Sequence, residues 1–545
     1  MRAVTLLIGG GVLWAALLLA AAPHAQGQPA AARPAAAPQL FETADRCQAC
    51  HNGLTTPSGR DVSIGVDWRA SMMAHSARDP YWQAAVRREV LDHPAAAAAI
   101  ENECSRCHMP MAHVTQTASG GTGQVFANLP AAGAATPMQA MAGDGVSCTV
   151  CHQITGDKLG SPESFTGHFV IDTVTPADQR TVFGPFAIDP GLQNLMHSAT
   201  TFRPAESAHV QSSELCATCH TLYTHTLDAA GKAIGTLPEQ VPYLEWRHSS
   251  YRDTKSCQAC HMPVVAEPVR VSSTMGEPRT EVSRHTFRGA NFWMLRVLNR
   301  FRDELGVPTL PQELELAAQD TLAHLERESA AVQIARAERD GGTLVLDLRV
   351  INRGGHKLPT AYPSRRVWLH VRIADPAGTV VFESGAVAPT GAIAGNDNDA
   401  DAAAYEPHYS EITDPGQVQI YENIMVDANG AVTTGLLTGL RYVKDSRLLP
   451  DGFDKATASA DIAVHGAASA DHDFTAGGDQ IRYRVAAPAG PLTVTAELLY
   501  QSIGYRWAHN LRTRPAPETE RFTRYYDAMS HVATARLAGA AATVR

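Results

Sequence analysis

The sequence predicts two domains of different kinds: a mainly α-helical and irregular domain that contains every cysteine, then an antiparallel β-sandwich with a terminal helix. The ten cysteines all lie between residues 47 and 260, whereas strand-like alternation of apolar and polar residues begins near residue 332. With 44% hydrophobic and 18% charged residues, the 545-residue chain has a globular composition. Its formal net charge of −10 argues against a nucleic-acid partner, which normally requires a basic surface.

The first residues have the pattern of a secretory signal peptide, which we place at residues 1–25. Arg2 precedes an apolar run, Val4–Ala22, and small residues follow that run. The run is long enough for an uncleaved membrane anchor, which is the alternative. An Ala/Pro linker follows at residues 26–40. We therefore expect an exported protein, periplasmic or at the cell surface, that is soluble after the signal peptide is cleaved.

Five cysteine pairs share one spacing, and a histidine follows each pair directly. The motifs are Cys47/Cys50/His51, Cys104/Cys107/His108, Cys148/Cys151/His152, Cys216/Cys219/His220 and Cys257/Cys260/His261. C-x-x-C-H is the attachment signature of c-type haem, in which two thiols bond to the porphyrin and the imidazole is the proximal iron ligand. A disulfide scaffold does not require the histidine, and zinc sites built from two pairs would leave one of five unmatched. The sequence predicts five covalent haem c groups, which would also supply apolar core where aromatic residues are scarce (6%).

The remaining segments follow in order along the chain. Residues 41–310 are the predicted pentahaem cytochrome c domain, and an amphipathic helix at 311–331 connects it to the β-sandwich at 332–515. Residues 516–545 are predicted as a C-terminal helix and tail. Four strand–turn–strand patterns predict the sandwich: residues 332–350, 365–384, 417–437 and 481–501.

Several segments resemble a known family. They are DWRASMMAHSARDPYW (67–82), DGVSCTVCH (144–152), SAHVQSSELCATCHTLYTH (207–225), YLEWRHSSY (243–251) and SCQACHMP (256–263). Together they are similar to the exported multihaem cytochromes c typified by the tetrahaem electron carrier of ammonia-oxidising bacteria. Residues 352–371 resemble a β-domain that is appended to some bacterial multihaem cytochromes. The resemblance implies electron transfer through closely packed haems, mostly with bis-histidine ligation.

The distal ligands of the haems are not fixed by the motifs, and ten other histidines lie between residues 41 and 325. The resemblance favours His209, seven residues before Cys216, and His285, just beyond the last motif. His197 and His225 flank the fourth motif and are further candidates.

The two W-x-x-S segments raise a separate question about ligands. In similar cytochromes a histidine often stands five residues after the tryptophan, where this chain has Met73, with His75 two residues further on. Either residue is a distal candidate, and an open site is the third option. The second segment has Tyr251 at the matching position, so we expect no ligand there unless His248 substitutes. His356, in the predicted β-domain, could reach a haem across the domain interface.

Three functions fit these features. The first is an electron carrier that works with redox partner proteins. The second is a haem-based oxidoreductase that acts on a small nitrogen or sulfur compound at one open haem. Pentahaem nitrite reductases have a similar length but carry a C-x-x-C-K motif, whereas all five motifs here end in histidine. The third, compatible with the first, is a protein whose β-domain binds an outer-membrane or surface partner.

Calcium is a weaker expectation, based on clustered acidic residues. Residues 395–407 contain Asp397, Asp399 and Asp401, which offer the oxygen ligands that calcium favours. A solvated acidic loop is the commoner explanation of this segment, and the same holds for the later group Asp471, Asp473 and Asp479.

Overall fold

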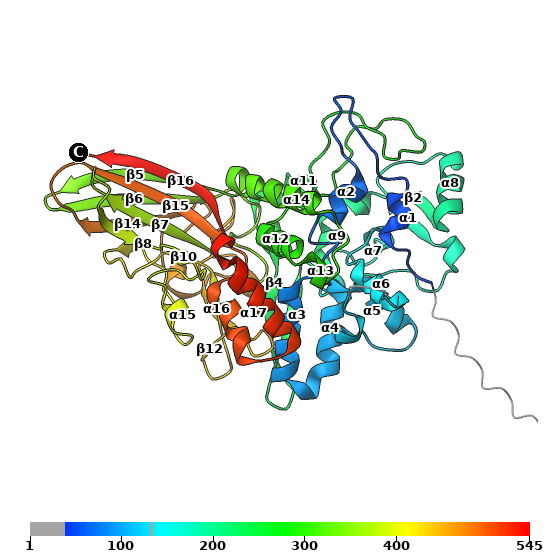
Figure 1. Cartoon of the computed structure of the whole chain (residues 1–545), viewed down its shortest axis with the longest axis horizontal. Helices are drawn as coiled ribbons and strands as arrows, with labels where there is room; N and C mark the ends of the chain where they lie inside the picture. The colour runs from blue at the N-terminus through cyan, green and yellow to red at the C-terminus, as the bar shows by residue number, and fades with distance from the viewer. Residues whose placement is uncertain (1–38, 131–134) are drawn as a thin grey trace, which may run out of the picture. The chain divides into compact units, whose positions relative to one another are not determined.

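Short helices and turns predominate from residue 39 to residue 329 of the described chain, and the longest strands lie in the remainder (Figure 1). The computed structural model describes residues 39–130 and 135–545, which belong to one compact unit. The predicted signal peptide and nearly all of the predicted linker lie outside the described residues. Within the described part, no helix is both long and apolar enough to cross a membrane.

Among the described residues, the first half contains fourteen α-helices, most of them only one to three turns long. They are α1 (Ala44–Gln48), α2 (Ile64–Arg69), α3 (Pro80–Asp92), α4 (Ala97–His108), α5 (Pro110–Ala118), α6 (Pro137–Gly143), α7 (Cys148–Cys151), α8 (Pro190–Thr200), α9 (Ser213–Ala217), α10 (Pro242–Arg247), α11 (Cys257–His261), α12 (Phe292–Arg300), α13 (Arg302–Leu305) and α14 (Pro311–His324). Several begin at a proline in the first turn, where its missing N–H costs no hydrogen bond. At α3, for example, the Asp79 carboxylate accepts hydrogen bonds from the amides of Tyr81 and Trp82. The predicted connecting helix is present as α14.

Two small pairs of strands also lie in this half, and the sequence analysis missed them. β1 (Thr181–Gly184) pairs in parallel with β2 (Arg203–Glu206), and β3 (Leu222–Leu227) pairs antiparallel with β4 (Ala233–Gln240). In β4, glycine and proline interrupt the alternation of apolar and polar residues, so the sequence lacks the period of two that predicts a strand.

Two larger sheets form most of the second half. One contains β10 (Ile420–Tyr421), β7 (Arg366–Ala374), β15 (Leu492–Gln501), β16 (Thr534–Val544) and, beside β7, β8 (Val380–Ser384). The other contains β5 (Ala330–Asp340), β6 (Thr343–Asn352), β14 (Asp479–Ala486) and β9 (Glu411–Ile412). Neighbouring strands are antiparallel except for β9 and β14. A third, small antiparallel sheet has the order β12 (Val432–Thr433), β11 (Asn423–Val426), β13 (Arg441–Asp445).

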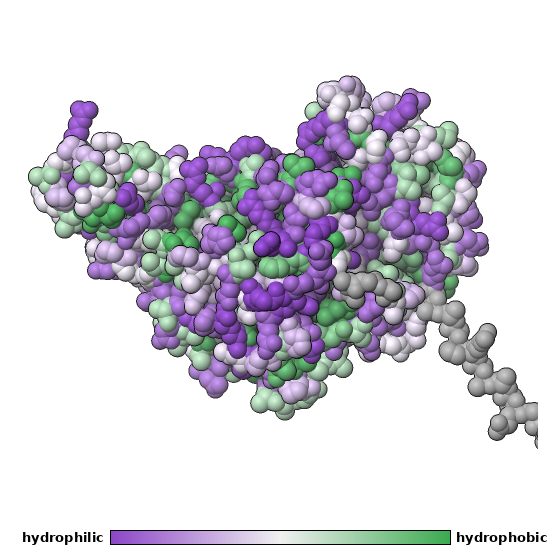
Figure 2. All heavy atoms as spheres, in the orientation of Figure 1, coloured by the Kyte–Doolittle hydropathy of each residue, from purple (hydrophilic) through white to green (hydrophobic). Residues whose placement is uncertain are grey.

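One apolar core fills the space between the two larger sheets. Residues of β6 such as Leu346 and residues of β7 such as Leu369 belong to the same buried cluster, which also includes Trp293 of α12 and Leu314 of α14. In β14, buried and exposed residues alternate strictly, as expected for a strand with one face in the core. The helices nearest the sheets therefore share the core of the strands. Over the face in Figure 2, hydrophilic and hydrophobic residues are interspersed.

Two sequence expectations in this half were wrong. The terminal helix ends early, because α17 (Pro517–Met529) is followed by strand β16, which pairs with β15 along its whole length. Its alanine-rich sequence suits a helix, but the open edge of β15 determines the conformation. The segment 481–501 is also not a hairpin: β14 pairs with β6, and β15 pairs with β7 and β16. Two further helices, α15 (Asp397–Ala400) and α16 (Tyr505–Asn510), lie in loops between strands.

Candidate haem-binding cavity

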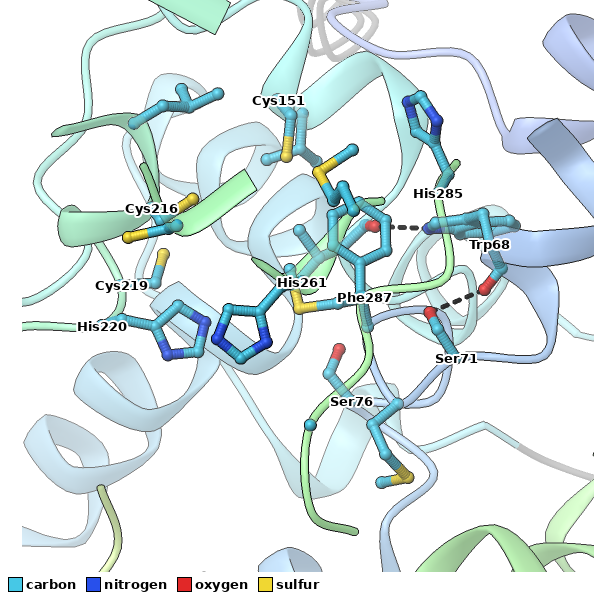
Figure 3. Close-up of a pocket in the computed structure, with 18 of the residues that line it drawn as sticks. Trp68, Ser71, Ser76, Cys151, Cys216, Cys219, His220, His261, His285 and Phe287 are labelled. Carbon is cyan, nitrogen blue, oxygen red and sulfur yellow. Dashed lines mark hydrogen bonds between the residues drawn. The ribbon is translucent and has the colours of Figure 1, made fainter. Parts of the chain in front are cut away.

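A single large cavity of about 2030 Å³ lies among the helices of the first half, and one wall comes from the sheet half. Pockets for small ligands usually measure roughly 300–1,000 Å³, so this space is large enough for something bigger than one such ligand. All ten cysteines and all five histidines of the C-x-x-C-H motifs line it. Part of the cavity is shown in Figure 3, where the rings of His220 and His261 lie near each other.

Each motif lies on or at the end of a short helix, and the motifs are neighbours in space. The adjacent thiol of Cys148 lowers the pKa of Cys47, which joins the first motif to the third. In the same way, Cys107 lowers the pKa of Cys219, and Cys216 lowers the pKa of Cys257 to about 7. The fourth motif therefore contacts the second and the fifth. Such proximity suits prosthetic groups that must lie close together.

Four of the five motif histidines have the same local environment. Each has its Nδ1 atom next to a backbone carbonyl oxygen, which leaves Nε2 free. The pairs are His51 and Val271 (2.6 Å), His108 and Ser76 (3.0 Å), His152 and Phe183 (2.5 Å), and His261 and Arg288. Burial lowers the pKa of His108 and of His261 to about 4, which keeps both rings neutral. A neutral imidazole whose Nδ1–H donates to a carbonyl is the form that ligates metals through Nε2. No such carbonyl contacts His220 among the described residues.

His285 lies near a motif histidine at the ring separation expected of a bis-histidine site. Its ring centroid is 6.4 Å from that of His152, and the two ring planes differ by 18°. With metal–nitrogen bonds of about 2.0 Å and roughly 1.1 Å from nitrogen to ring centroid, two imidazoles on opposite sides of one iron have centroids about 6.2 Å apart. The Nδ1 atom of His285 lies 3.1 Å from the carbonyl oxygen of Ser283, so Nε2 is free here too. The residues present therefore fit a haem held between His152 and His285.

A second pair has nearly the same geometry. The ring centroids of His261 and His356 are 6.3 Å apart, and their planes differ by 12°. His356 belongs to the loop between β6 and β7, and it lines the cavity.

The other distal candidates divide into two groups. His225, on β3, and Met73 line the cavity, whereas His75, His197 and His209 are not among its lining residues. His75 is buried with its Nε2 atom 3.1 Å from the hydroxyl of Thr309. Of the two candidates in the first W-x-x-S segment, the structure thus directs Met73 and not His75 toward the cavity.

The remaining two candidates, His197 and His209, form hydrogen bonds through their ring nitrogens. His209 has Nδ1 at 2.6 Å from the Ser207 hydroxyl and Nε2 at 2.8 Å from the Ile154 carbonyl oxygen, so both ring nitrogens are engaged. His197 has Nε2 at 2.6 Å from the carbonyl oxygen of Asp178. In these positions neither ring offers a free Nε2.

Two further histidines and five methionines line the cavity although the sequence predicted no role for them. They are His168, His324, Met72, Met196, Met262, Met275 and Met294. His168 and His324 were among the ten histidines counted there, but no motif distinguishes them from surface histidines. Met196 lies on the face of α8 that also presents Leu192 and Leu195 to the cavity. A helical spacing of apolar residues was the only signal for that face.

The acidic segments do not form an evident calcium site. Asp399 is buried and pairs with Arg366 (2.8 Å), and it also accepts a hydrogen bond from the Ile393 amide (2.8 Å). Asp401 accepts from the amide of Ala403. Two of the three aspartates are thus engaged by protein groups, and calcium there stays a prediction.

A separate buried cluster joins His408, Asp471 and Asp479. The amide group of Gln419 donates to Nδ1 of His408 (2.8 Å) and to Asp479 (3.0 Å), because its oxygen already accepts from the amide of Tyr409. The proton of His408 is therefore on Nε2, which donates to Asp471 at 3.2 Å. A protonated Nε2 is not a metal ligand, so the geometry indicates a hydrogen-bonded cluster.

Comparison with known proteins bears on the fold. No family model matches the chain, and no curated protein matches it significantly. Among solved structures, the chain is similar to a penta-haem cytochrome c552 from Thermochromatium tepidum, with a TM-score of 0.51 and 14% sequence identity. The match covers 92% of this chain and 98% of that chain, so it includes both the helical and the sheet half. The chain therefore has the fold of a multihaem cytochrome c.

Proposed function

We propose that this chain is a c-type cytochrome that carries electrons through five covalently bound haems, in the periplasm or at the cell surface. The observation that supports it most is that all five C-x-x-C-H motifs line one continuous cavity. When bound, haem supplies a one-electron iron couple whose potential depends on its axial ligands and surroundings. The finer assignment, to the family typified by the tetrahaem carrier of ammonia oxidisers, rests on the segments quoted from the sequence.

The residues of the chain would perform three tasks in such a carrier. The motif cysteines fix each group in place. The carbonyl oxygens of Val271, Ser76 and Phe183 orient the proximal imidazoles and raise their basicity. Apolar side chains such as Trp82, which stacks on His108 with ring centroids 4.4 Å apart, keep water from the ligands. Redox partner proteins, and a surface partner for the sheet half, belong to this proposal.

A second candidate is a haem-based oxidoreductase with one open site at the fourth motif. His220 differs from the other motif histidines because no backbone carbonyl contacts its ring in the described part of the chain. Burial lowers the pKa of His220, and the nearby cationic Arg365 lowers it further. A guanidinium group beside an open haem would attract a small oxyanion. Two observations favour the carrier: the two imidazole pairs, and the histidine that ends each of the five motifs.

The experiment that separates the two begins with the mass of the intact holoprotein. Five haem additions are expected, and fewer would contradict the proposal. Low-temperature EPR and optical spectra then follow, with and without nitrite, hydroxylamine or carbon monoxide. Five low-spin irons that do not respond to these ligands would support the carrier. A high-spin iron that binds them would support the oxidoreductase.

A further inference from the structure

We propose that His356, from the sheet half of the chain, is the sixth ligand of the haem attached at Cys257 and Cys260. This inference rests on the proposed function, because it requires that haem be bound at the fifth motif. It assigns a ligand that lies outside the cysteine-rich segment and makes the strands a necessary part of a redox centre.

The first argument is the agreement between two independent pairs of imidazoles. His261 and His356 reproduce the centroid separation and near-parallel planes of His152 and His285 within 0.1 Å and 6° (6.3 against 6.4 Å, 12° against 18°). In both pairs, every Nδ1 atom lies near a backbone carbonyl oxygen. For His356 that oxygen belongs to Lys357, at 3.0 Å. All four Nε2 atoms are thus left for a metal.

The second argument is that the loop carrying His356 forms a wall of the cavity. Twelve of the fourteen residues from Asn352 to Arg365 line it, which makes this loop the main contribution of the sheet half. The loop is not free to move away, because Lys357 is fully buried and its Nζ atom pairs with Asp445 at 2.8 Å. Arg447 pairs with the same carboxylate at 2.7 Å. Moving the loop away would break the buried ion pair between Lys357 and Asp445.

The third argument is that the fifth motif's own segment anchors the loop. Glu245 lies on α10, twelve residues before Cys257, and it has no exposed surface. Its carboxylate accepts hydrogen bonds from the backbone amide of Lys357 (3.1 Å) and from the hydroxyl of Thr360 (2.5 Å), and it pairs with Arg447 (2.8 Å). One buried carboxylate thus ties the cysteine-rich half to the part of the loop that directly follows His356.

The similarity between the two W-x-x-S segments agrees with this assignment. The first segment directs Met73 into the cavity, whereas the second has Tyr251 at the matching position. Tyr251 donates its hydroxyl hydrogen to the carbonyl oxygen of Arg353 at 3.0 Å, and its side chain lies against Gly355. The second segment therefore supports the loop that supplies His356 and contributes no ligand of its own.

His324 is the competitor that the test must exclude. It lines the same wall, and His261 lies close enough to be affected by its charge. Its Nδ1 atom is 3.5 Å from a carboxylate oxygen of Glu328 rather than next to a backbone carbonyl. His248 is a suitable control outside the cavity wall, since its Nε2 atom lies 2.9 Å from the carbonyl oxygen of Asp454.

The test compares the holoproteins of His356→Ala, His324→Ala and His248→Ala with the unchanged chain. Each is examined by EPR, by titration with imidazole and carbon monoxide, and by peptide mass for haem on Cys257 and Cys260. We expect His356→Ala to keep five haems, with one fifth of the iron converted to a high-spin form that binds one equivalent of imidazole. The other two variants should keep five low-spin irons. His356→Met, which retains a ligand, should stay low-spin with the red absorption band of methionine-ligated ferric haem.

Other results would overturn the assignment. Five low-spin irons in His356→Ala, or a high-spin iron in His324→Ala alone, would show that His356 is not the ligand. If His356→Ala does not accumulate, a His356→Met protein without the methionine band would lead to the same conclusion. Absence of haem from Cys257 and Cys260 in the unchanged chain would instead contradict the proposed function itself.

Discussion

Tyr251 lies directly against the backbone of Gly355: a Cβ atom at the glycine would stand 3.3 Å from both Cβ and Cγ of the tyrosine. The indole of Trp246 lies almost as near, at 3.4 Å. Both aromatic residues belong to the segment just before the fifth motif, whereas Gly355 precedes His356 in the loop between β6 and β7. The contact holds the loop against the cysteine-rich half and leaves no room for a larger residue.

A first prediction follows for Gly355→Val. Its branched side chain would clash with Tyr251 and Trp246 and displace the loop, because overpacking forces such shifts at a typical cost of about 1–3 kcal/mol. We expect a partial high-spin EPR signal from one haem and a lower unfolding temperature. The control is Gly342→Val, at a glycine whose Cβ would meet nothing within 4 Å. Equal EPR spectra for the two variants would contradict the prediction.

A second prediction concerns the pair formed by His152 and His285. Replacing His285 by Met should keep the third haem six-coordinate and raise its reduction potential, since thioether ligands favour ferrous iron. The expected shift is on the order of 100 mV, within the span of about 0.8 V that axial ligands cover. Spectroelectrochemistry would resolve one shifted component among five. His209→Met, where both ring nitrogens are already hydrogen bonded, should leave all five potentials in place.

A third prediction concerns the stability supplied by Glu245. Glu245→Gln removes a buried negative charge that faces Arg447, and breaking such a pair typically costs about 3–5 kcal/mol. We expect a loss at the lower end, because Asp445 remains beside the guanidinium. Denaturant unfolding measures it. Glu338→Gln, in an exposed pair with Arg336 at 3.0 Å, should change the free energy of unfolding by less than about 1 kcal/mol.

A fourth prediction tests the role of haem in the core. Replacing Cys216 and Cys219 by Ala should abolish haem attachment at the motif that contacts two others, and the yield of holoprotein should fall sharply. The reason is that the cavity would lose the apolar body that separates its walls. Yield and haem content after purification measure the effect. A stable four-haem protein at normal yield would show that the polypeptide alone can support the cavity.

A fifth prediction is a change in pH dependence at the cluster of His408 and Asp479. Burial raises the pKa of Asp479 to about 7, so its contribution to stability falls as the pH rises from about 4 to 7. Burial lowers the pKa of His408 to about 4, so its contribution rises between about pH 4 and 6.5. In the unchanged chain the two trends oppose each other, so the net contribution of this pair to stability should be nearly independent of pH in this range.

Variants of this cluster should separate the two trends. Asp479→Asn leaves the histidine, so the free energy of unfolding should rise by up to about 3 kcal/mol from pH 4.5 to 6.5, at about 1.4 kcal/mol per pKa unit. His408→Gln leaves the carboxyl group and should show the opposite slope. Unfolding at a series of pH values measures both. Two parallel curves would contradict the pKa values assigned to the pair.

The sequence alone predicts the five attachment motifs, because the covalent chemistry of haem attachment would fix their spacing within five residues. The hairpins of β5 with β6 and of β7 with β8 were confirmed for a similar reason, since each is a local pattern of alternation around a glycine-containing turn. Strand β16 could not be predicted in this way. Its alanines carry little information, and its conformation depends on pairing with β15, more than thirty residues earlier in the chain.

The second ligands were harder to predict than the first because they depend on the tertiary fold. His285 was suggested by resemblance, and its position opposite His152 agrees with that suggestion. His356 lies 95 residues after His261, and no spacing rule connects the two. His209 is the opposite case. The resemblance favours it as a distal ligand, but its ring nitrogens form hydrogen bonds with Ser207 and Ile154.

The last segment of the chain has a consequence for the timing of assembly. Helix α17 and strand β16 attach the sheets to the helices, through Glu518 bound to Arg87 (2.8 Å) and through the indole of Trp293, which donates to the Met529 carbonyl oxygen (3.0 Å). Synthesis runs from the N-terminus, so these contacts form last. If the proposed haems are attached, the cysteines, all within the first 260 residues, would be synthesised before these closing contacts can form. The order of the segments would thus allow every haem to be attached before the molecule closes around it.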